Sequence, residues 1–192
     1  MSRATANRTR IAGREDIESL IELTLLARLE SPLTAQLCTV EPTHLDGLLE
    51  AWIAMDGSSV IVAEVDGAVV GFVLAQVLPP NLFSDVSIIQ IEGLFVRQEY
   101  RRRGLARNLL AEVSRIAEEN DVEHIVTIIL TGSRQELRFL AGLGFDHAGA
   151  RRVVDVPTLN RRLTANSRER RIRGIDDLIE RRRRSRNLTS AG

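Results

Sequence analysis

Two runs rich in valine and isoleucine lie in the middle of this chain, separated by only two residues. The runs cover Ser59 to Val65 and Ala68 to Leu78, and Asp66 and Gly67 stand between them. β-branched side chains favour strands, and an Asp-Gly pair favours the positive φ angles of a tight turn. The sequence therefore predicts a β-hairpin, which constrains the chain to build the rest of its fold around a sheet.

The residues before the hairpin show helical spacing. We expect a helix over Glu15 to Leu29 whose apolar stripe ends at Leu29, and a second short helix, capped by Thr43, with Leu48 on its apolar side. Both stripes are expected to face a core.

After the hairpin, strand and helix patterns alternate. They predict a strand, a helix, a buried parallel strand, a helix opened by a capping box, and a last strand. These elements cover Ser87 to Val96, Leu105 to Asn120, His124 to Leu130, Ser133 to Leu143 and His147 to Val156. The order predicts an α/β (α+β) fold, with a mixed sheet and helices packed against it.

The composition indicates one globular domain with a basic tail. The chain has 192 residues, 44% hydrophobic and 27% charged, with no net charge. After Pro157, however, the chain contains eleven arginines and only four acidic residues. We therefore expect a domain over 1–156 and a basic helical tail over 157–192. We expect the tail's apolar stripe to pack as a helix and its arginines to be solvated, which makes nucleic-acid binding unlikely.

The cysteine count and the apolar runs indicate a compartment. Cys38 is the single cysteine, so no disulfide framework is expected, and the longest apolar run, Ala68 to Leu78, is too short to cross a bilayer. Three histidines lack carboxylate or cysteine neighbours at metal-ligand spacing, so no metal is expected. We expect a cytoplasmic protein that does not bind a membrane.

The stretch from Ile91 to Arg107 carries the chemical signal. It reads as a strand to Val96, a charged turn, and a helix start after Gly104. The first turn of a helix has unpaired N–H groups and a positive dipole end, so it can hold a pyrophosphate. On spacing alone, the pattern favours a solvated basic turn over a pyrophosphate site.

Arg101-x-x-Gly104-x-Ala106, preceded by Leu94-Phe95-Val96 and Glu99-Tyr100, resembles the acetyl-CoA motif Q/R-x-x-G-x-G/A of the GNAT superfamily of N-acetyltransferases. The resemblance runs in order over about residues 10 to 156 and includes the pair Gly144-Phe145. It implies a mixed, mostly antiparallel central sheet that is flanked by helices and splayed at the cofactor strand. It also implies transfer of an acetyl group from acetyl-CoA to a primary amine.

The resemblance further implies which residues hold acetyl-CoA. The pantetheine arm would lie against the strand end, the turn amides would hold the pyrophosphate, and the amide near Val96 would polarise the thioester. The residues concerned are Leu94, Phe95, Val96, Arg101, Arg102, Arg103, Gly104, Leu105, Ala106 and Arg107.

Glu92 stands where many relatives carry the base that removes a proton from the amine, although a structural salt bridge would explain it equally well. Leu140 occupies the position at which many relatives carry a tyrosine acid, and Tyr100 is expected to pack in the turn. The alternative function is therefore a catalytically silent CoA-binding module that reaches a partner through the basic tail. The acceptor stays open, and a homodimer is compatible with the sequence.

Overall fold

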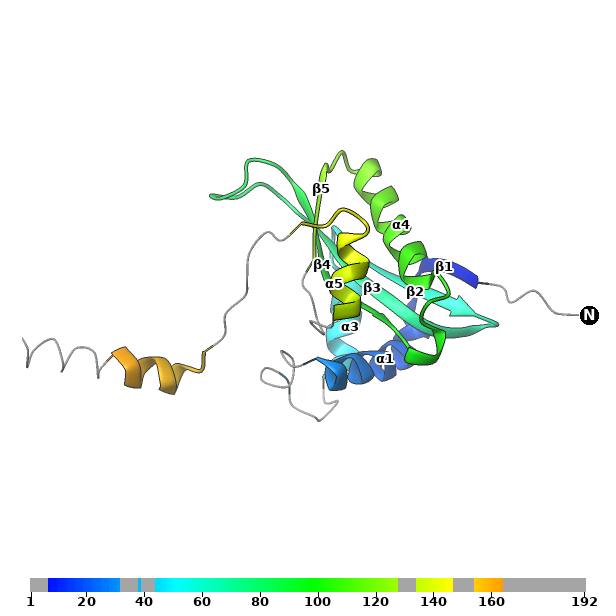
Figure 1. Cartoon of the computed structure of the whole chain (residues 1–192), viewed down its shortest axis with the longest axis horizontal. Helices are drawn as coiled ribbons and strands as arrows, with labels where there is room; N and C mark the ends of the chain where they lie inside the picture. Colours follow the sequence, from blue (N-terminus) through cyan, green and yellow to red (C-terminus); the bar gives the residue numbers. More distant parts are fainter. Residues whose placement is uncertain (1–6, 32–37, 39–43, 128–133, 147–153, 164–192) are drawn as a thin grey trace, which may run out of the picture. The chain divides into compact units, whose positions relative to one another are not determined.

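The computed structural model describes residues 7–31, 38, 44–127, 134–146 and 154–163. Two compact units, Met1–Phe145 and Asp146–Gly192, make up the chain. The described elements of the first unit, in chain order (Figure 1), are β1 (Asn7–Ile11), the 3-10 turn η1 (Arg14–Asp16), α1 (Ile17–Glu30), α3 (Leu45–Ala54), β2 (Ser58–Val65), β3 (Ala68–Leu78), β4 (Ile88–Val96), the 3-10 turn η2 (Gln98–Tyr100), α4 (Leu105–Glu119), β5 (His124–Thr127) and α5 (Arg134–Ala141).

The five strands form one sheet in the order β1-β2-β3-β4-β5. The first three pairings are antiparallel, and β5 runs parallel to β4. Asp66 (φ 51°) and Gly67 (φ 86°) make the tight turn between β2 and β3, where Val65 pairs with Ala68. The predicted hairpin and the mixed, mostly antiparallel sheet are therefore confirmed.

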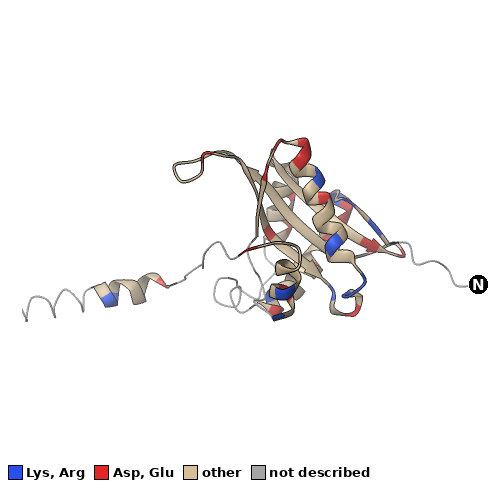
Figure 2. Cartoon of the chain, turned by 45° about the horizontal axis from the view of Figure 1, so that its top comes forward, with Lys and Arg blue, Asp and Glu red and all other residues tan. Residues whose placement is uncertain are grey.

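Both faces of the sheet are buried. Successive strand residues point to opposite sides, so β2, β3 and β4 each contribute side chains to both faces. One face packs against α1 and α3, and the other packs against α4 and α5 (Figure 1). The α1 and α3 face carries Val60, Val62, Phe72 and Phe95. The α4 and α5 face carries Ile61, Ala63, Val73, Ile91 and Val96. Figure 2 shows that the central strands are largely uncharged and that charged residues gather on helices and turns.

Two predicted core leucines lie at the surface. Leu29 in α1 is 78% exposed and Leu48 in α3 is 62% exposed. The buried residues of α1 are Leu20, which belongs to the predicted stripe, and Leu23 and Ala27, which do not. An apolar stripe in the sequence can be wider than the face that a helix buries, and here the sheet contacts only part of each stripe. The expected cap Thr43 lies outside the described residues, and His44 (φ 81°) precedes α3.

Two expectations about the later strands need correction. β5 was expected to be buried on both faces, but its described residues alternate between exposed and half-buried, and Val126 is 37% exposed. A last strand was expected to end at Val156, but residues 156–163 are helical. Asp155 caps this helix by accepting a hydrogen bond from the Thr158 N–H (2.7 Å).

The rest of that strand, the end of the β5 run, Ser133 and the tail from residue 164 onward lie outside the described residues. The domain boundary at Pro157 stays a prediction.

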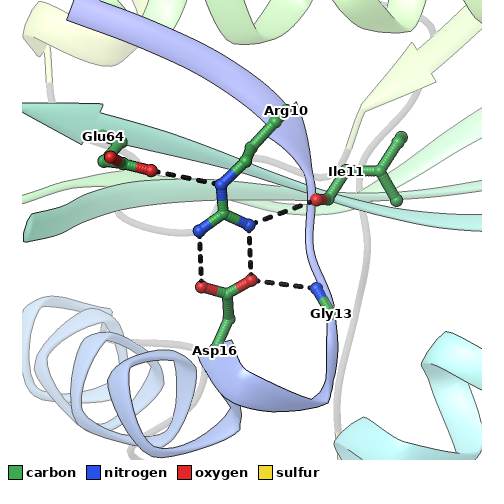
Figure 3. A network of polar contacts seen from close by, with 5 residues as sticks. All are labelled: Arg10, Ile11, Gly13, Asp16 and Glu64. Carbon is green, nitrogen blue, oxygen red and sulfur yellow. Dashed lines mark hydrogen bonds and ion pairs between the residues drawn. The ribbon is translucent and has the colours of Figure 1, made fainter. Parts of the chain in front are cut away.

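A network around Arg10 ties β1 and β2 to the start of α1 (Figure 3). The guanidinium of Arg10 donates to both carboxylate oxygens of Asp16 (2.6 and 2.8 Å) and to Glu64 (3.1 Å). Asp16, which is only 3% exposed, also accepts from the Gly13 N–H (2.9 Å). The Arg10 guanidinium, helped by this N–H, holds the pKa of Asp16 below its usual value although burial acts in the opposite direction.

Asp16→Asn should lower the free energy of unfolding at neutral pH by about 2 to 3 kcal/mol, because it leaves Arg10 without its main partner. Arg10 is partly exposed and keeps Glu64, so the loss should fall short of that for a fully buried pair. A carboxylate with a lowered pKa stabilises the fold above its unfolded pKa of about 4, and this contribution is lost as the pH falls through the folded pKa.

Urea unfolding of wild type and Asp16→Asn, followed from pH 7 to acid, measures this difference. It should shrink below about pH 4. Glu112→Gln, which breaks an exposed pair with Arg115, is the matched control and should cost under about 0.5 kcal/mol. Equal stability of the two proteins at pH 7 would contradict the assigned role.

Gly71 in β3 should not tolerate a side chain. A Cβ there would lie 2.8 Å from the Phe95 carbonyl oxygen and 3.0 Å from a methyl group of Val96. Gly71→Ala should therefore lower stability by about 1 to 3 kcal/mol through overpacking. Gly47→Ala is the matched control, because that position in α3 is open and alanine is the better helix former. Thermal unfolding should show a loss for the first variant and no loss for the second; equal melting temperatures would be inconsistent with this packing.

Candidate functional site

A β-bulge in β4 places Glu92. Gly93 pairs with Leu74 and Ile91 pairs with Ala75, so Glu92 has no partner in β3. The extra residue shifts the alternation of side chains by one, which lets both Ile91 and Leu94 pack on the α4 side of the sheet. The half-buried Glu92 carboxylate accepts a hydrogen bond from the Gln90 side chain.

The end of β4 presents its backbone on the side away from β3. The Arg97 N–H donates to the Val70 carbonyl (2.9 Å) and therefore points toward β3, whereas the Arg97 C=O accepts from the Tyr100 N–H (2.9 Å) in the turn. Successive residues of a strand alternate, and the N–H and C=O of Val96 therefore face the other way. Among the described residues, β5 pairs with Ile88 to Ile91 of β4, and no described strand residue pairs with Val96 on that side.

The turn after β4 leads into an uncapped helix. Arg102 (φ 62°) and Gly104 (φ 84°) adopt left-handed backbone conformations, and α4 begins at Leu105. No side chain caps this N-terminus, and its first turn contains Arg107 and no acidic residue. A helix start of this kind leaves amide donors and positive charge available to an anion.

These segments surround one cavity of about 640 Å³. It is lined by residues from the ends of α1 and β4, from the turn, from the start of α4 and from α5. The lining consists of Glu30, Leu94, Phe95, Val96, Tyr100, Arg101, Arg102, Gly104, Leu105, Ala106, Arg107, Gln135, Glu136 and Phe139. Nine of the ten residues predicted to hold acetyl-CoA are therefore brought together here.

Two predicted site residues do not line the cavity. Arg103 lies over the Tyr100 ring (5.1 Å) and donates to the Glu99 carbonyl (3.1 Å). Glu92 is the other, and its described hydrogen bond is to Gln90 on the same strand.

The lining also contains residues that the sequence pattern did not indicate. Glu30 comes from α1, and Gln135, Glu136 and Phe139 come from α5. These residues lie far from the motif in the sequence, and the sequence around them contains no local signal that relates them to the cavity. The spacing of α5 alone predicts which of its residues face the core.

The three arginines in the lining differ in their partners. Arg101 is paired with Glu30 (2.7 Å), its Nε donates to the Val96 carbonyl (2.7 Å), and its guanidinium lies over the Phe95 ring (5.4 Å). Within the described ranges, Arg102 and Arg107 have no ion pair.

Leu140 is 5% exposed and packs in the core between α4, α5 and the sheet, so this position offers no hydroxyl group to the cavity.

Among the residues that the structure describes, no three histidine, cysteine or carboxylate side chains gather as metal ligands. In the same part of the chain, no helix is long and apolar enough to cross a membrane.

Comparison with solved structures finds the same fold in several proteins. An aminoglycoside N-acetyltransferase, AAC(6′)-Iy, in complex with CoA superposes with a TM-score of 0.65 at 19% identity, over 81% of this chain and 96% of that one. A ribosomal-protein-alanine N-acetyltransferase from Brucella melitensis gives 0.61 at 19% identity, over 78% and 99%. A transcriptional regulator from Bacillus halodurans gives 0.66 at 18% identity, over 78% and 99%.

A search of curated protein sequences finds no match. The sequence model of the acetyltransferase (GNAT) family matches residues 25–145, which is more than half of the chain and includes β4, the turn and α4. This match, together with the shared fold, shows that the chain belongs to the GNAT acetyltransferase family.

Proposed function

We propose that this protein is an acetyl-CoA-dependent N-acetyltransferase that acetylates a primary amine. The observation that carries the proposal is the cavity of about 640 Å³ between the end of β4 and the uncapped start of α4. One wall offers strand backbone, and the other offers helix amides and positive charge. An extended arm that ends in a phosphate group fits such a pair of walls.

The residues present fit the phosphate part of acetyl-CoA. The amides at the start of α4 would donate to the pyrophosphate, and Arg102 and Arg107, which have no ion pair among the described residues, would add positive charge. The backbone of Leu94 to Val96 would run beside the pantetheine arm. The ligand contributes a reactive thioester, and the Val96 N–H would stabilise the oxyanion that forms on its carbonyl.

Transfer of the acetyl group needs a neutral amine, because an ammonium ion has no lone pair. The amine nitrogen would form the new bond to the acetyl carbon while the carbon–sulfur bond breaks and CoA leaves as a thiolate. We propose Glu92 as the base that takes the proton from the amine. Its carboxylate is outside the cavity lining, so a bridging water would carry the proton. With Leu140 in the core, solvent would protonate the thiolate.

The acceptor is proposed only as a class. Two structural neighbours are named for their acceptors: one for an aminoglycoside and the other for an alanine of a ribosomal protein. An amine acceptor is common to both names, and identity below 20% supports no finer choice. We also propose a cytoplasmic location, as the single cysteine suggests.

Gly104→Glu should lower the affinity for acetyl-CoA by about tenfold or more, because a carboxylate would stand beside the pyrophosphate. Calorimetric titration of the purified protein measures this change. Gly67→Glu is the matched control: both glycines have φ near 85°, and both have open space around the added Cβ, but Gly67 lies in the β2–β3 turn. Saturable binding by wild type and by the control, lost in Gly104→Glu, is expected. Equal binding by both variants would place the ligand elsewhere.

Glu92→Gln should lower kcat by about 10² to 10⁴ in a screen of primary amines, with the affinity for acetyl-CoA unchanged. Release of the CoA thiol measures turnover. Glu123→Gln changes an exposed carboxylate just before β5 and should leave turnover intact. Full turnover by Glu92→Gln would show that Glu92 is not the base. Binding of acetyl-CoA by wild type without turnover of any amine would favour the silent CoA-binding module instead.

A further inference from the structure

The side chain of Arg101 is held on three sides by other residues of the cavity wall. Its Nε donates to the Val96 carbonyl (2.7 Å), and one Nη donates to both carboxylate oxygens of Glu30 (2.7 and 2.9 Å). The guanidinium also lies 5.4 Å from the centre of the Phe95 ring. It is about one-third exposed, as is the Glu30 carboxylate.

This arrangement makes Arg101 poorly suited to bind a phosphate. Its charge is already paired with Glu30, and a phosphate would have to compete with a two-oxygen contact to a carboxylate. Arg102 and Arg107 line the same cavity and have no ion pair within the described ranges. The cavity therefore has other arginines whose charge is available for an anionic ligand.

The same arrangement suits Arg101 to hold the end of β4. The Val96 carbonyl faces away from β3, and no strand residue among those described pairs with it on that side. Arg101 supplies a donor there, which a poorly solvated carbonyl needs. On the opposite side, Gly71 lets β3 approach the Phe95 carbonyl closely. Val96 is thus fixed from both sides, with its N–H toward the cavity.

We propose that Arg101 is a positioning residue and not a phosphate ligand. It orients Val96 at the acyl-pantetheine end of the cavity, and through Glu30 it fastens the end of α1 to that wall. This inference rests on the proposed function, since it assumes that the cavity receives acetyl-CoA. It assigns to the first residue of the motif a role that differs from that of Arg102 and Arg107.

Two neutral substitutions separate the two roles. The Nε2 of glutamine lies the same number of bonds from Cα as the Nε of arginine, so Arg101→Gln can keep the bond to the Val96 carbonyl. Arg101→Leu cannot keep it. Both variants lose the positive charge, so they differ chiefly in the donor to Val96.

The probes are acetyl-CoA and ADP, with ADP measured as a competitor. ADP contains a pyrophosphate but lacks the pantetheine arm. Arg101→Leu should bind acetyl-CoA about tenfold more weakly, with ADP affinity within about twofold of wild type. Arg101→Gln should retain wild-type affinity for both within about threefold. Arg107→Leu, the contrasting variant, should weaken both ligands alike.

If both Arg101 variants bound ADP and acetyl-CoA more weakly by the same factor, Arg101 would be a residue that binds phosphate, and the inference would be overturned. Unchanged affinities in Arg101→Leu would overturn it as well. If Arg101→Leu does not fold, Arg101→Gln decides alone, because a phosphate ligand cannot be replaced by a neutral amide without loss of ADP affinity. No binding by wild type would instead reject the proposed function, and this inference with it.

Glu30→Gln gives an independent measure. The amide oxygen can still accept from Arg101, but the negative charge is gone. A positioning role predicts that ADP affinity stays within about twofold. A gain of about fivefold or more would show that the released guanidinium binds phosphate, which would overturn the inference.

Discussion

The candidate site depends on the antiparallel ladder between β3 and β4. The bulge at Glu92 shifts the side-chain alternation, so the strand can bury Ile91 and Leu94 on the same face. Beyond the bulge, Gly71 brings β3 close to Phe95. The ladder thereby fixes one edge of β4, and Leu94, Phe95 and Val96 at the end of this strand line the cavity.

Local patterns predicted much of the fold. The β2–β3 hairpin and α4 are as expected, because turn chemistry and strong periodicity lie within a few residues of each other. Burial was less predictable. Leu29 and Leu48 are exposed, and β5 is less buried than its β-branched run indicated, because burial depends on which neighbours arrive from elsewhere in the chain. Asp16 shows the same limit, since its buried pairing with Arg10 has no signal in periodicity.

Nine of the ten cofactor residues expected from the motif line one cavity, because they are nearly contiguous in the sequence. What the motif could not reveal is how those residues divide their roles. Arg101 reads like the other arginines of the turn, yet its carboxylate partner Glu30 is 71 residues away. α5 adds a wall to the cavity and, with Leu140 in the core, offers no hydroxyl group at the position where relatives carry one.

The most direct test of the account is a crystal structure of the protein with acetyl-CoA bound. The account predicts the pyrophosphate within hydrogen-bond distance of the amides at the start of α4, the pantetheine arm beside Leu94 to Val96, and the Glu30–Arg101 pair intact. Acetyl-CoA bound away from the cavity, or with its phosphates on the Arg101 side chain, would contradict it.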